Sequence, residues 1–495
     1  MSHWLNEKQL RRTRPAESAG ASPVPTQVVS NGEYLPAPQT SRQKQVEAVL
    51  GELADSLGRK HGLDRRQFLK TASGMAAAFV AMNQVYGALF DVGVAEAAEP
   101  AAAAERLTKL AKQVVIDVQL HFVRDDFMWD GLLMLGEWAK RWNPVLAREG
   151  VTLSRYKFEN FVKEVFLDSE TRLGLISGAP SDDPSHGVIG SAGLAKAREV
   201  VNGLAGSKRL MSHSLLRPGQ RGWLEEIDHA LAEWKPDSWK GYTVGDPLAP
   251  SQFPWRMDDE KVTYPGWEKI AKSDRRIVCV HKGLLPADYE TSTKHWRHAM
   301  VDDVGKAAKD WPQLTFVIYH AGLKPFLTEP DESLAQFEKT GRMDWVTDLA
   351  EIPAKYGVTN VYAELGTSFA TSAVTHPRHC AALLGTLIKG MGADHVLWGT
   401  DSVWYGSPQW QIEAFRRIEI PEDMRKTHGF APLGAADGAV KSGILARNAA
   451  RLYDIDLAKL ADTSTSDSLA AAKREYESAG AERSNVAYGF IHRDT

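Results

Sequence analysis

QVVIDVQLHF, residues 113–122, begins as a buried strand and ends with polar side chains on one face. The apolar β-branched letters VVI at its start are typical of a strand that is covered on both faces. Asp117, Gln119 and His121 then follow at intervals of two residues, so their side chains project from the same face. This arrangement indicates a functional site at the carboxyl end of a buried strand.

Similar apolar runs recur along the chain, and a helix-length segment separates most consecutive ones. This alternation favours an α/β fold with parallel strands, specifically a (β/α)8 TIM barrel with its active site at the carboxyl ends of the strands. An open doubly wound sheet is the alternative, but it requires a glycine-rich phosphate loop after the first strand, where this chain has FVRDD. The expected strands are VVIDVQLHF (114–122), LGLISG (173–178), KRLMSHSLL (208–216), SWKGYTV (238–244), RIVCVHKG (276–283), LTFVIYHAG (314–322), NVYAELG (360–366) and HVLWGTD (395–401).

Four of these strands end on a residue with metal-binding or acid/base chemistry. His121 ends the first, His281 the fifth, His320 the sixth and Asp401 the eighth. One such histidine alone would most often be a hydrogen-bonded core residue. In a barrel, however, all four side chains and Gln119 converge on one small volume, which predicts a catalytic or metal site there.

Composition narrows the class of protein. The chain has 495 residues, 43% hydrophobic and 25% charged, with a net charge of −4. It lacks the basic excess of a nucleic-acid binder. Cys279 and Cys380 supply neither a disulfide framework nor a four-ligand zinc cluster. No permanent membrane span is expected, because no stretch reaches about 18 uninterrupted apolar residues.

The first hundred residues differ from the rest. The composition of residues 1–60 predicts a disordered extension, which ends in a short amphipathic segment. Arg65 and Arg66, followed by an apolar stretch and the small residues of Ala95-Glu96-Ala97, resemble a twin-arginine signal over residues 61–98. An ordinary helix with a chance arginine pair is the alternative. The signal predicts recognition by the twin-arginine export machinery and a periplasmic or extracellular location. The barrel is expected over residues 105–460, with a C-terminal helix and tail over 461–495.

The motifs IDVQLHF, IYHAG, LWGTDSVW and GILARNAARLYDID, spread over roughly residues 112–456, resemble the amidohydrolase superfamily. The likeness is to its amidohydrolase-related branch, which includes aminocarboxymuconate semialdehyde decarboxylase, resorcylate decarboxylases and pyrone dicarboxylate lactonase. The resemblance implies that His121, His281 and Asp401 are metal ligands and that His320 acts as acid/base. It also implies a histidine where this chain has Gln119, because the family's first strand normally ends His-x-His.

The glutamine leaves the metal set open to three interpretations. Three protein ligands and a water make a catalytic zinc site, so His121, His281 and Asp401 suffice without a fourth. The amide oxygen of Gln119 could be a further ligand, in which case a harder ion such as manganese suits it better than zinc. Gln119 could instead only hydrogen-bond water or substrate, or the metal could be lost, as the resemblance to the lactonase branch implies. We expect one divalent ion, zinc or manganese.

Four further residues at or after strand ends are weaker candidates for contacts with substrate. Lys240 could bind a substrate anion or, as in some amidohydrolases, be carbamylated; Arg217 could bind a carboxylate in fork geometry. Glu364 could orient a catalytic group, and Trp404 could stack on a planar substrate. Structural roles explain all four nearly as well.

The leading functional hypothesis is an exported metal-dependent hydrolase that attacks a small molecule with a metal-activated water. A non-oxidative decarboxylase of an aromatic or unsaturated acid is the first alternative. A non-catalytic exported binding protein on a decayed barrel is the second. The sequence identifies neither the substrate nor the oligomeric state. A homo-oligomer is one alternative for the latter.

Overall fold

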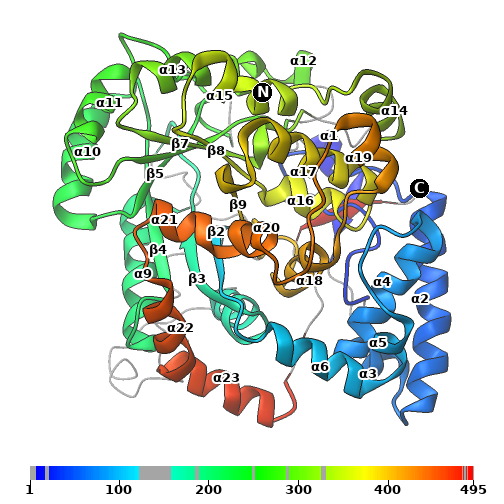
Figure 1. Ribbon diagram of the computed structural model, residues 1–495. Coiled ribbons are helices and arrows are strands. Elements are labelled where there is room, and N and C mark those ends of the chain that lie inside the picture. Colours follow the sequence, from blue (N-terminus) through cyan, green and yellow to red (C-terminus); the bar gives the residue numbers. More distant parts are fainter. Residues whose placement is uncertain are drawn as a thin grey trace.

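The computed structural model describes residues 7–16, 22–121, 158–183, 189–247, 251–285, 289–324, 330–481, 483, 487 and 489–493. Figure 1 shows the central strands of this part of the chain, with helices packed around them.

The eight central strands are parallel and lie side by side in sequence order from β2 to β9. The first and last strands also meet: Leu120 bridges Ser402, and the backbone N–H of Val118 donates to the carbonyl of Trp398 at 3.0 Å. The sheet is therefore closed, which confirms the predicted (β/α)8 barrel and all eight predicted strands. Their bounds are β2 (Val115–Leu120), β3 (Thr171–Ile176), β4 (Leu210–Leu215), β5 (Ser238–Tyr242), β6 (Ile277–His281), β7 (Thr315–Tyr319), β8 (Val361–Glu364) and β9 (Val396–Leu397).

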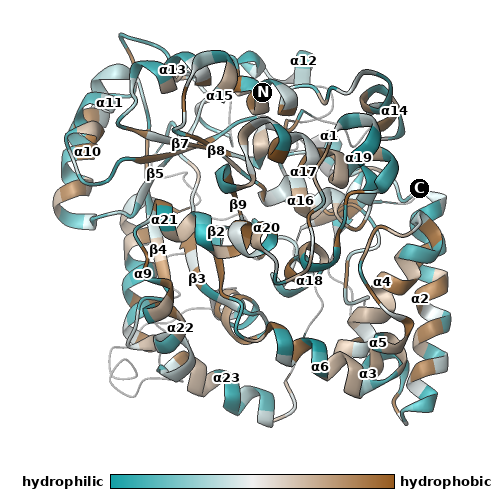
Figure 2. Cartoon of the chain, viewed as in Figure 1, coloured by the Kyte–Doolittle hydropathy of each residue, from teal (hydrophilic) through white to brown (hydrophobic). Residues whose placement is uncertain are grey.

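The strands form because their apolar side chains are buried on two sides. On β6, Cys279 packs inside the barrel, whereas Val278 and Val280 pack against the surrounding helices. Figure 2 shows β7 largely in the hydrophobic colour. This alternation of inward and outward positions is the pattern of a filled barrel, and it leaves the strand ends for polar residues.

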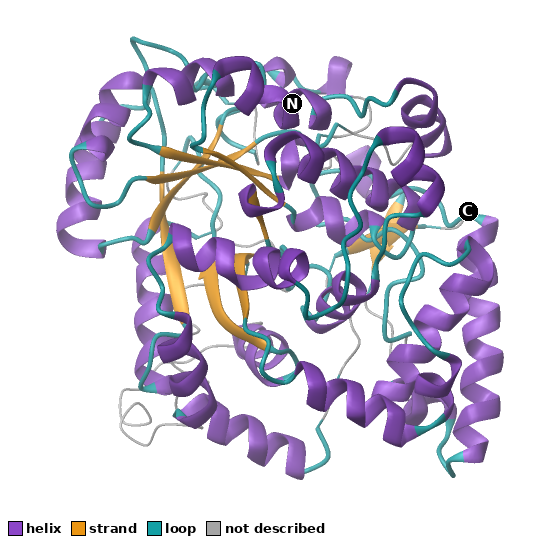
Figure 3. Ribbon diagram, in the orientation of Figure 1, coloured by secondary structure: helices purple, strands orange, loops and turns teal. Residues whose placement is uncertain are grey.

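Helices follow the strands and cover the barrel from outside (Figure 3). Helix α9 packs on β4, and α15 packs on α17. The helices after β3 are α9 (Ser191–Ala205), α10 (Trp223–His229), α11 (Tyr264–Ala271), α12 (Tyr289–Ser292), α13 (Val304–Asp310), α14 (Pro330–Thr340), α15 (Val346–Tyr356), α16 (Gly366–Ser372), α17 (Pro377–Met391), α18 (Gln409–Arg417), α19 (Glu422–His428), α20 (Ala439–Ser442), α21 (Asn448–Leu452), α22 (Leu457–Ser466) and α23 (Ser468–Ser478); the short α8 (Phe158–Val162) precedes β3.

The N-terminal helices form a separate layer beside the barrel, drawn in blue in Figure 1. They are α2 (Ser41–Lys60), α3 (Arg65–Leu69), α4 (Ala72–Tyr86), α5 (Val94–Ala98) and α6 (Pro100–Leu110). The amphipathic piece of the sequence is α2. The arginine pair begins α3, where Arg65 pairs with Asp55 of α2. The apolar stretch behind it is α4, whose buried Phe79 contacts the guanidinium of Arg417 on α18. No helix of the described residues is long and apolar enough to cross a membrane.

Residues 22–40 have defined positions in the structure, although their composition places them in a disordered extension. Val28, Val29 and Tyr34 are buried in the main core. The backbone of Ser30 pairs with Phe490 of β10 (Phe490–His492), which itself pairs with β1 (Thr13–Pro15); the small helix α1 (Glu7–Leu10) precedes β1. Composition indicates only how much apolar surface a segment can bury by itself. This segment is instead buried against a barrel whose residues come later in the chain, and its own composition cannot show that.

Candidate active site

The carboxyl ends of the strands place five predicted residues together at one mouth of the barrel. The Nε2 atom of His121 lies 3.0 Å from Oδ1 of Asp401, and the amide nitrogen of Gln119 donates to the same oxygen at 3.0 Å. The rings of His281 and His320 meet edge to face with their centroids 4.6 Å apart. All five residues are buried apart from His121, which is partly exposed. The barrel therefore brings the predicted set together.

Asp401 is the charged centre of this group. Its carboxylate also accepts hydrogen bonds from the hydroxyl of Thr367 and, at 3.4 Å, from the amide of Asn31. Burial by itself raises the pKa of this carboxyl, but the neighbouring His121 and His320 and the hydrogen bond from Thr367 lower it to about 2. Asp401 is therefore an anion at neutral pH. Asp401 has a φ of 56°, in the left-handed region, and it lines the cavity at the barrel mouth.

His320 follows β7 with a φ of 60°, and its backbone is held from both sides. Its N–H donates to Oε2 of Glu364 at 3.1 Å, and its carbonyl accepts from the hydroxyl of Ser368 at 2.5 Å. The N–H of Thr367 donates to Nδ1 of the ring at 3.3 Å, and the amide nitrogen of Gln119 lies 3.3 Å from Nε2. Burial lowers the pKa of His320 to about 4 despite the charge of Asp401, so the ring is neutral at pH 7.

A carboxylate from the N-terminal segment completes a second grouping. Oε1 of Glu33 lies 3.7 Å from Nδ1 of His281, whose ring stacks on Tyr242 with centroids 4.3 Å apart. One ligand atom each from Glu33, His281 and His320 lie within 4.8 Å of one another. These spacings are those of a candidate metal site, with Gln119 nearby.

The side-chain amide of Gln119 is tightly enclosed. Its Oε1 is buried and has no hydrogen-bond partner among the described residues. Gly366 approaches so closely that a Cβ atom there would lie 2.3 Å from this oxygen and 2.9 Å from Nδ1 of His320. A buried amide oxygen without a partner is costly, so this atom fits a position that faces a cation or water.

Two of the weaker candidates, Glu364 and Lys240, lie inside the barrel. Glu364 holds the backbone of His320, and burial raises its pKa well above the usual value. Lys240 is fully buried; its Nζ lies over the ring of Tyr319, 3.5 Å from the centroid, and has no hydrogen-bond partner in the described part of the chain. Burial lowers the pKa of Lys240 to about 8. Nearby Asp117, whose oxygens accept from Thr400, has its pKa raised by burial to about 7.

The other two weaker candidates, Arg217 and Trp404, lie apart from each other. The guanidinium of Arg217 binds the carboxylate of Glu226 on α10, so its fork is already used within the protein. Trp404 is buried and lines the cavity at the barrel mouth. That cavity measures about 20 Å³ between the described residues, and Glu33, Gln119, His121, His320 and Asp401 share its lining.

Sequence reasoning did not find Asn31, Glu33 or Thr367. Asn31-Gly32 is a turn dipeptide and could have marked a tight turn, but nothing in its neighbourhood indicated contact with the barrel. Thr367 lies one residue beyond the glycine that ends the predicted strand 360–366, inside a run of small polar residues.

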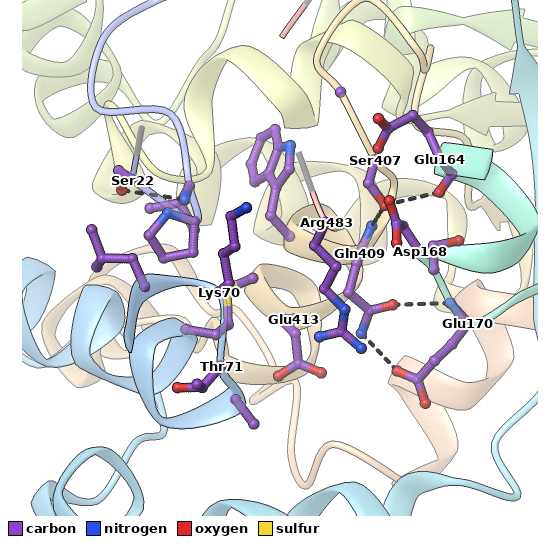
Figure 4. Close-up of a pocket in the computed structure, with 18 of the residues that line it drawn as sticks. Ser22, Lys70, Thr71, Glu164, Asp168, Glu170, Ser407, Gln409, Glu413 and Arg483 are labelled. Atoms are coloured by element: carbon purple, nitrogen blue, oxygen red, sulfur yellow. Dashed lines mark hydrogen bonds between the residues drawn. The ribbon is translucent and has the colours of Figure 1, made fainter. Parts of the chain in front are cut away.

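A second cavity of about 750 Å³ lies between the N-terminal helices, α18 and α23, and it shares no described lining residue with the barrel mouth. Figure 4 shows its charged and polar walls, where Gln409 exchanges hydrogen bonds with Glu170. Arg417 pairs there with Glu96 and Glu413. The ion pair between Arg417 and Glu96 of α5 joins the N-terminal layer to the barrel.

The closed barrel carries histidines and Asp401 at its strand ends, and part of the chain matches a known family. The sequence pattern of the amidohydrolase family matches residues 235–455. The matched part contains His281, His320 and Asp401, whereas Gln119 and His121 on β2 lie before it. No curated protein matches the chain.

Several solved structures resemble the chain weakly. They include 2,6-dihydroxybenzoate decarboxylase from Rhizobium (14% identity, 70% of this chain and 99% of that one, TM-score 0.40). Another is 5-carboxyvanillate decarboxylase from Sphingomonas paucimobilis (13%, 70% and 100%, TM-score 0.37). A third is an amidohydrolase from Burkholderia multivorans with bound zinc (17%, 69% and 100%, TM-score 0.39). Likeness at this level carries no argument about activity.

Proposed function

We propose that this protein is a metal-dependent hydrolase of the amidohydrolase superfamily that acts on a small molecule at the barrel mouth. One observation carries the proposal. Strand ends that are far apart in the sequence place His121, His320 and Asp401 around one cavity, and the ring of His281 packs against that of His320. The family match over residues 235–455 supports the same class.

The donor atoms fit a divalent cation. Imidazole nitrogens and carboxylate oxygens are the ligands of zinc and manganese in catalytic sites. His121, His281 and Asp401 are the proposed ligands, with Glu33 and the unpartnered Oε1 of Gln119 close by. A cation bound there would polarise a substrate carbonyl and lower the pKa of a water molecule towards about 7.

The protein's own residues would position and move the proton. His320 is neutral at pH 7, so its ring can first take a proton and then deliver it to a leaving group. Glu364 and Ser368 fix the backbone of His320, which holds the ring in place. Nε2 of His121 and Oδ1 of Asp401 lie 3.0 Å apart, a separation at which both atoms could bind one cation. Loss of one acid/base group typically costs about 100- to 10,000-fold in rate.

The test is a product assay on metal-loaded protein in H2(18)O. A panel of small esters, lactones, amides and aromatic carboxylic acids serves as substrate. Hydrolysis puts one 18O atom into the product. Release of carbon dioxide without 18O in the organic product would instead establish the decarboxylase alternative. If metal-loaded protein turns over none of these classes but still binds them, the non-catalytic alternative replaces the proposal.

A further inference from the structure

The segment of residues 28–34 reaches the barrel mouth although it precedes β2 and the whole predicted export signal in the chain. Every residue of this N-terminal segment is buried. Glu33 and Asn31 line the same cavity as His121 and Asp401. A segment that composition alone assigns to a solvated extension thus supplies two polar side chains to the site.

Local hydrogen bonds give the N-terminal segment a definite shape. The N–H of Glu33 donates to Oδ1 of Asn31 at 3.1 Å, and the N–H of Gly32 donates to Oγ of Ser30 at 2.9 Å. Gly32 has a φ of 104°, a conformation that favours glycine. The result is a tight turn with the side chains of Asn31 and Glu33 at its tip.

The turn is also anchored to the opposite end of the chain. The backbone of Ser30 donates to and accepts from Phe490 at 2.7 and 2.8 Å. At Gly489 a Cβ atom would lie 2.2 Å from the carbonyl of Ser30, so the backbones of the two segments lie in close contact. The position of Glu33 is therefore set by backbone pairing and does not depend on its own side chain.

The tip places a second carboxyl group beside Asp401. The amide of Asn31 donates to Oε2 of Glu33 at 2.6 Å and to Oδ2 of Asp401 at 3.4 Å. The side chain of Glu33 is only 2% exposed, and its Oε1 lies 3.7 Å from His281. Burying two carboxyl groups close together costs free energy, and a divalent cation bound to both would offset that cost.

We infer that Glu33 is a ligand of the divalent cation and that residues 28–34 are a permanent part of the active site. This inference rests on the proposed metal-dependent function. Glu33 supplies an anionic oxygen where β2 offers only the neutral amide of Gln119. Cleavage after Ala97 would separate Glu33 from the barrel, so the active form keeps its N-terminal segment attached.

The test titrates Mn²⁺ and Zn²⁺ into metal-stripped full-length protein. Glu33→Gln keeps the shape of the side chain and removes its charge. It should weaken metal binding at least about 100-fold. Loss of a residue that only hydrogen-bonds a metal ligand, without binding the metal itself, costs roughly 10- to 100-fold in metal affinity. Glu33→Asp keeps a carboxylate and should recover part of the affinity. The matched control is Glu52→Gln, the same change at an exposed position of α2, which should bind as wild type does.

Thermal unfolding with and without metal separates a ligand from a structural residue. Metal should raise the Tm of wild type and of Glu52→Gln but not of Glu33→Gln, whose metal-free Tm should match that of wild type. If Glu33→Gln binds metal within threefold of wild type, the inference is wrong while the proposed function stands. If wild type itself binds neither ion, the proposed function fails first. An intact mass showing that the exported protein begins after Ala97 and binds metal fully would also overturn the inference.

Discussion

Replacing Lys240 by methionine should stabilise the protein. Lys240 is fully buried and its ammonium has no hydrogen-bond partner in the described part of the chain, so burial lowers its pKa from 10.5 to about 8. At about 1.36 kcal/mol per pKa unit, the charged form is penalised by about 3 kcal/mol at pH 7. The cation–π contact of Lys240 with the face of Tyr319 offsets about 0.5–2 kcal/mol of this penalty. Lys240→Met keeps a long, flexible side chain and removes the charge. It should therefore raise the free energy of unfolding by about 1–3 kcal/mol.

The pH dependence gives this prediction its sign. The folded pKa lies below the unfolded one, so between about pH 8 and 10.5 the unfolded chain holds more protons and the stability of wild type rises with pH. The advantage of Lys240→Met should be full below about pH 8 and should fade as pH rises towards 10.5.

Lys282 is the matched control, because it is equally buried but its Nζ binds both oxygens of Asp303 at 2.7 and 2.8 Å. Lys282→Met should destabilise by about 3–5 kcal/mol, since it leaves a buried carboxylate without its partner. The assay is thermal and urea unfolding of both variants and wild type at several pH values. If Lys240→Met is less stable than wild type at pH 7, or if its advantage does not change with pH, the interpretation of Lys240 as an uncompensated buried charge is wrong.

Three further changes test the site and the N-terminal region. Gly366→Ala should lower turnover at least about 100-fold by displacing Gln119 and His320, because the new Cβ atom would lie 2.3 Å from the amide oxygen of Gln119. The control is Gly203→Ala in α9, where a Cβ atom meets nothing within 4 Å and turnover should not change. Equal rates in the two variants would show that close packing at Gly366 does not matter for turnover. His320→Gln should keep metal content and lose about 100- to 10,000-fold in rate; loss of the metal instead would make His320 a ligand. Changing Arg65 and Arg66 together to lysine should retain the protein in the cytoplasm, as fractionation would show, and normal export of this variant would refute the predicted signal.

The barrel could be predicted from sequence because each strand carries its own signal. Runs such as IVCV (277–280) and FVIY (316–319) are buried on both sides, and the polar residue that follows each one marks the end of the strand. Once eight such strands close in order, their carboxyl ends must share one mouth. The meeting of His121, His281, His320 and Asp401 follows from that topology alone.

Contacts that depend on distant surfaces could not be predicted in this way. Glu33 lies in a segment without apolar periodicity, and the backbone of Ser30 holds this segment by pairing with Phe490 near the other end of the chain. Arg217 follows a strand as a substrate-binding residue would, but the loop after it turns the guanidinium onto Glu226. Sequence shows where a side chain leaves a strand, whereas its partner is decided by loops and docked segments.

Anomalous X-ray scattering can show whether a divalent cation binds at the barrel mouth. Crystals of full-length protein purified with Mn²⁺ or Zn²⁺ would be measured above and below the absorption edge of the metal. We expect one strong anomalous peak per chain within ligand distance of His281 and Asp401, and we expect this peak to be lost in His281→Ala. No anomalous peak at the barrel mouth of the wild-type protein, or an equal peak in His281→Ala, would show that His281 and Asp401 do not bind a metal there.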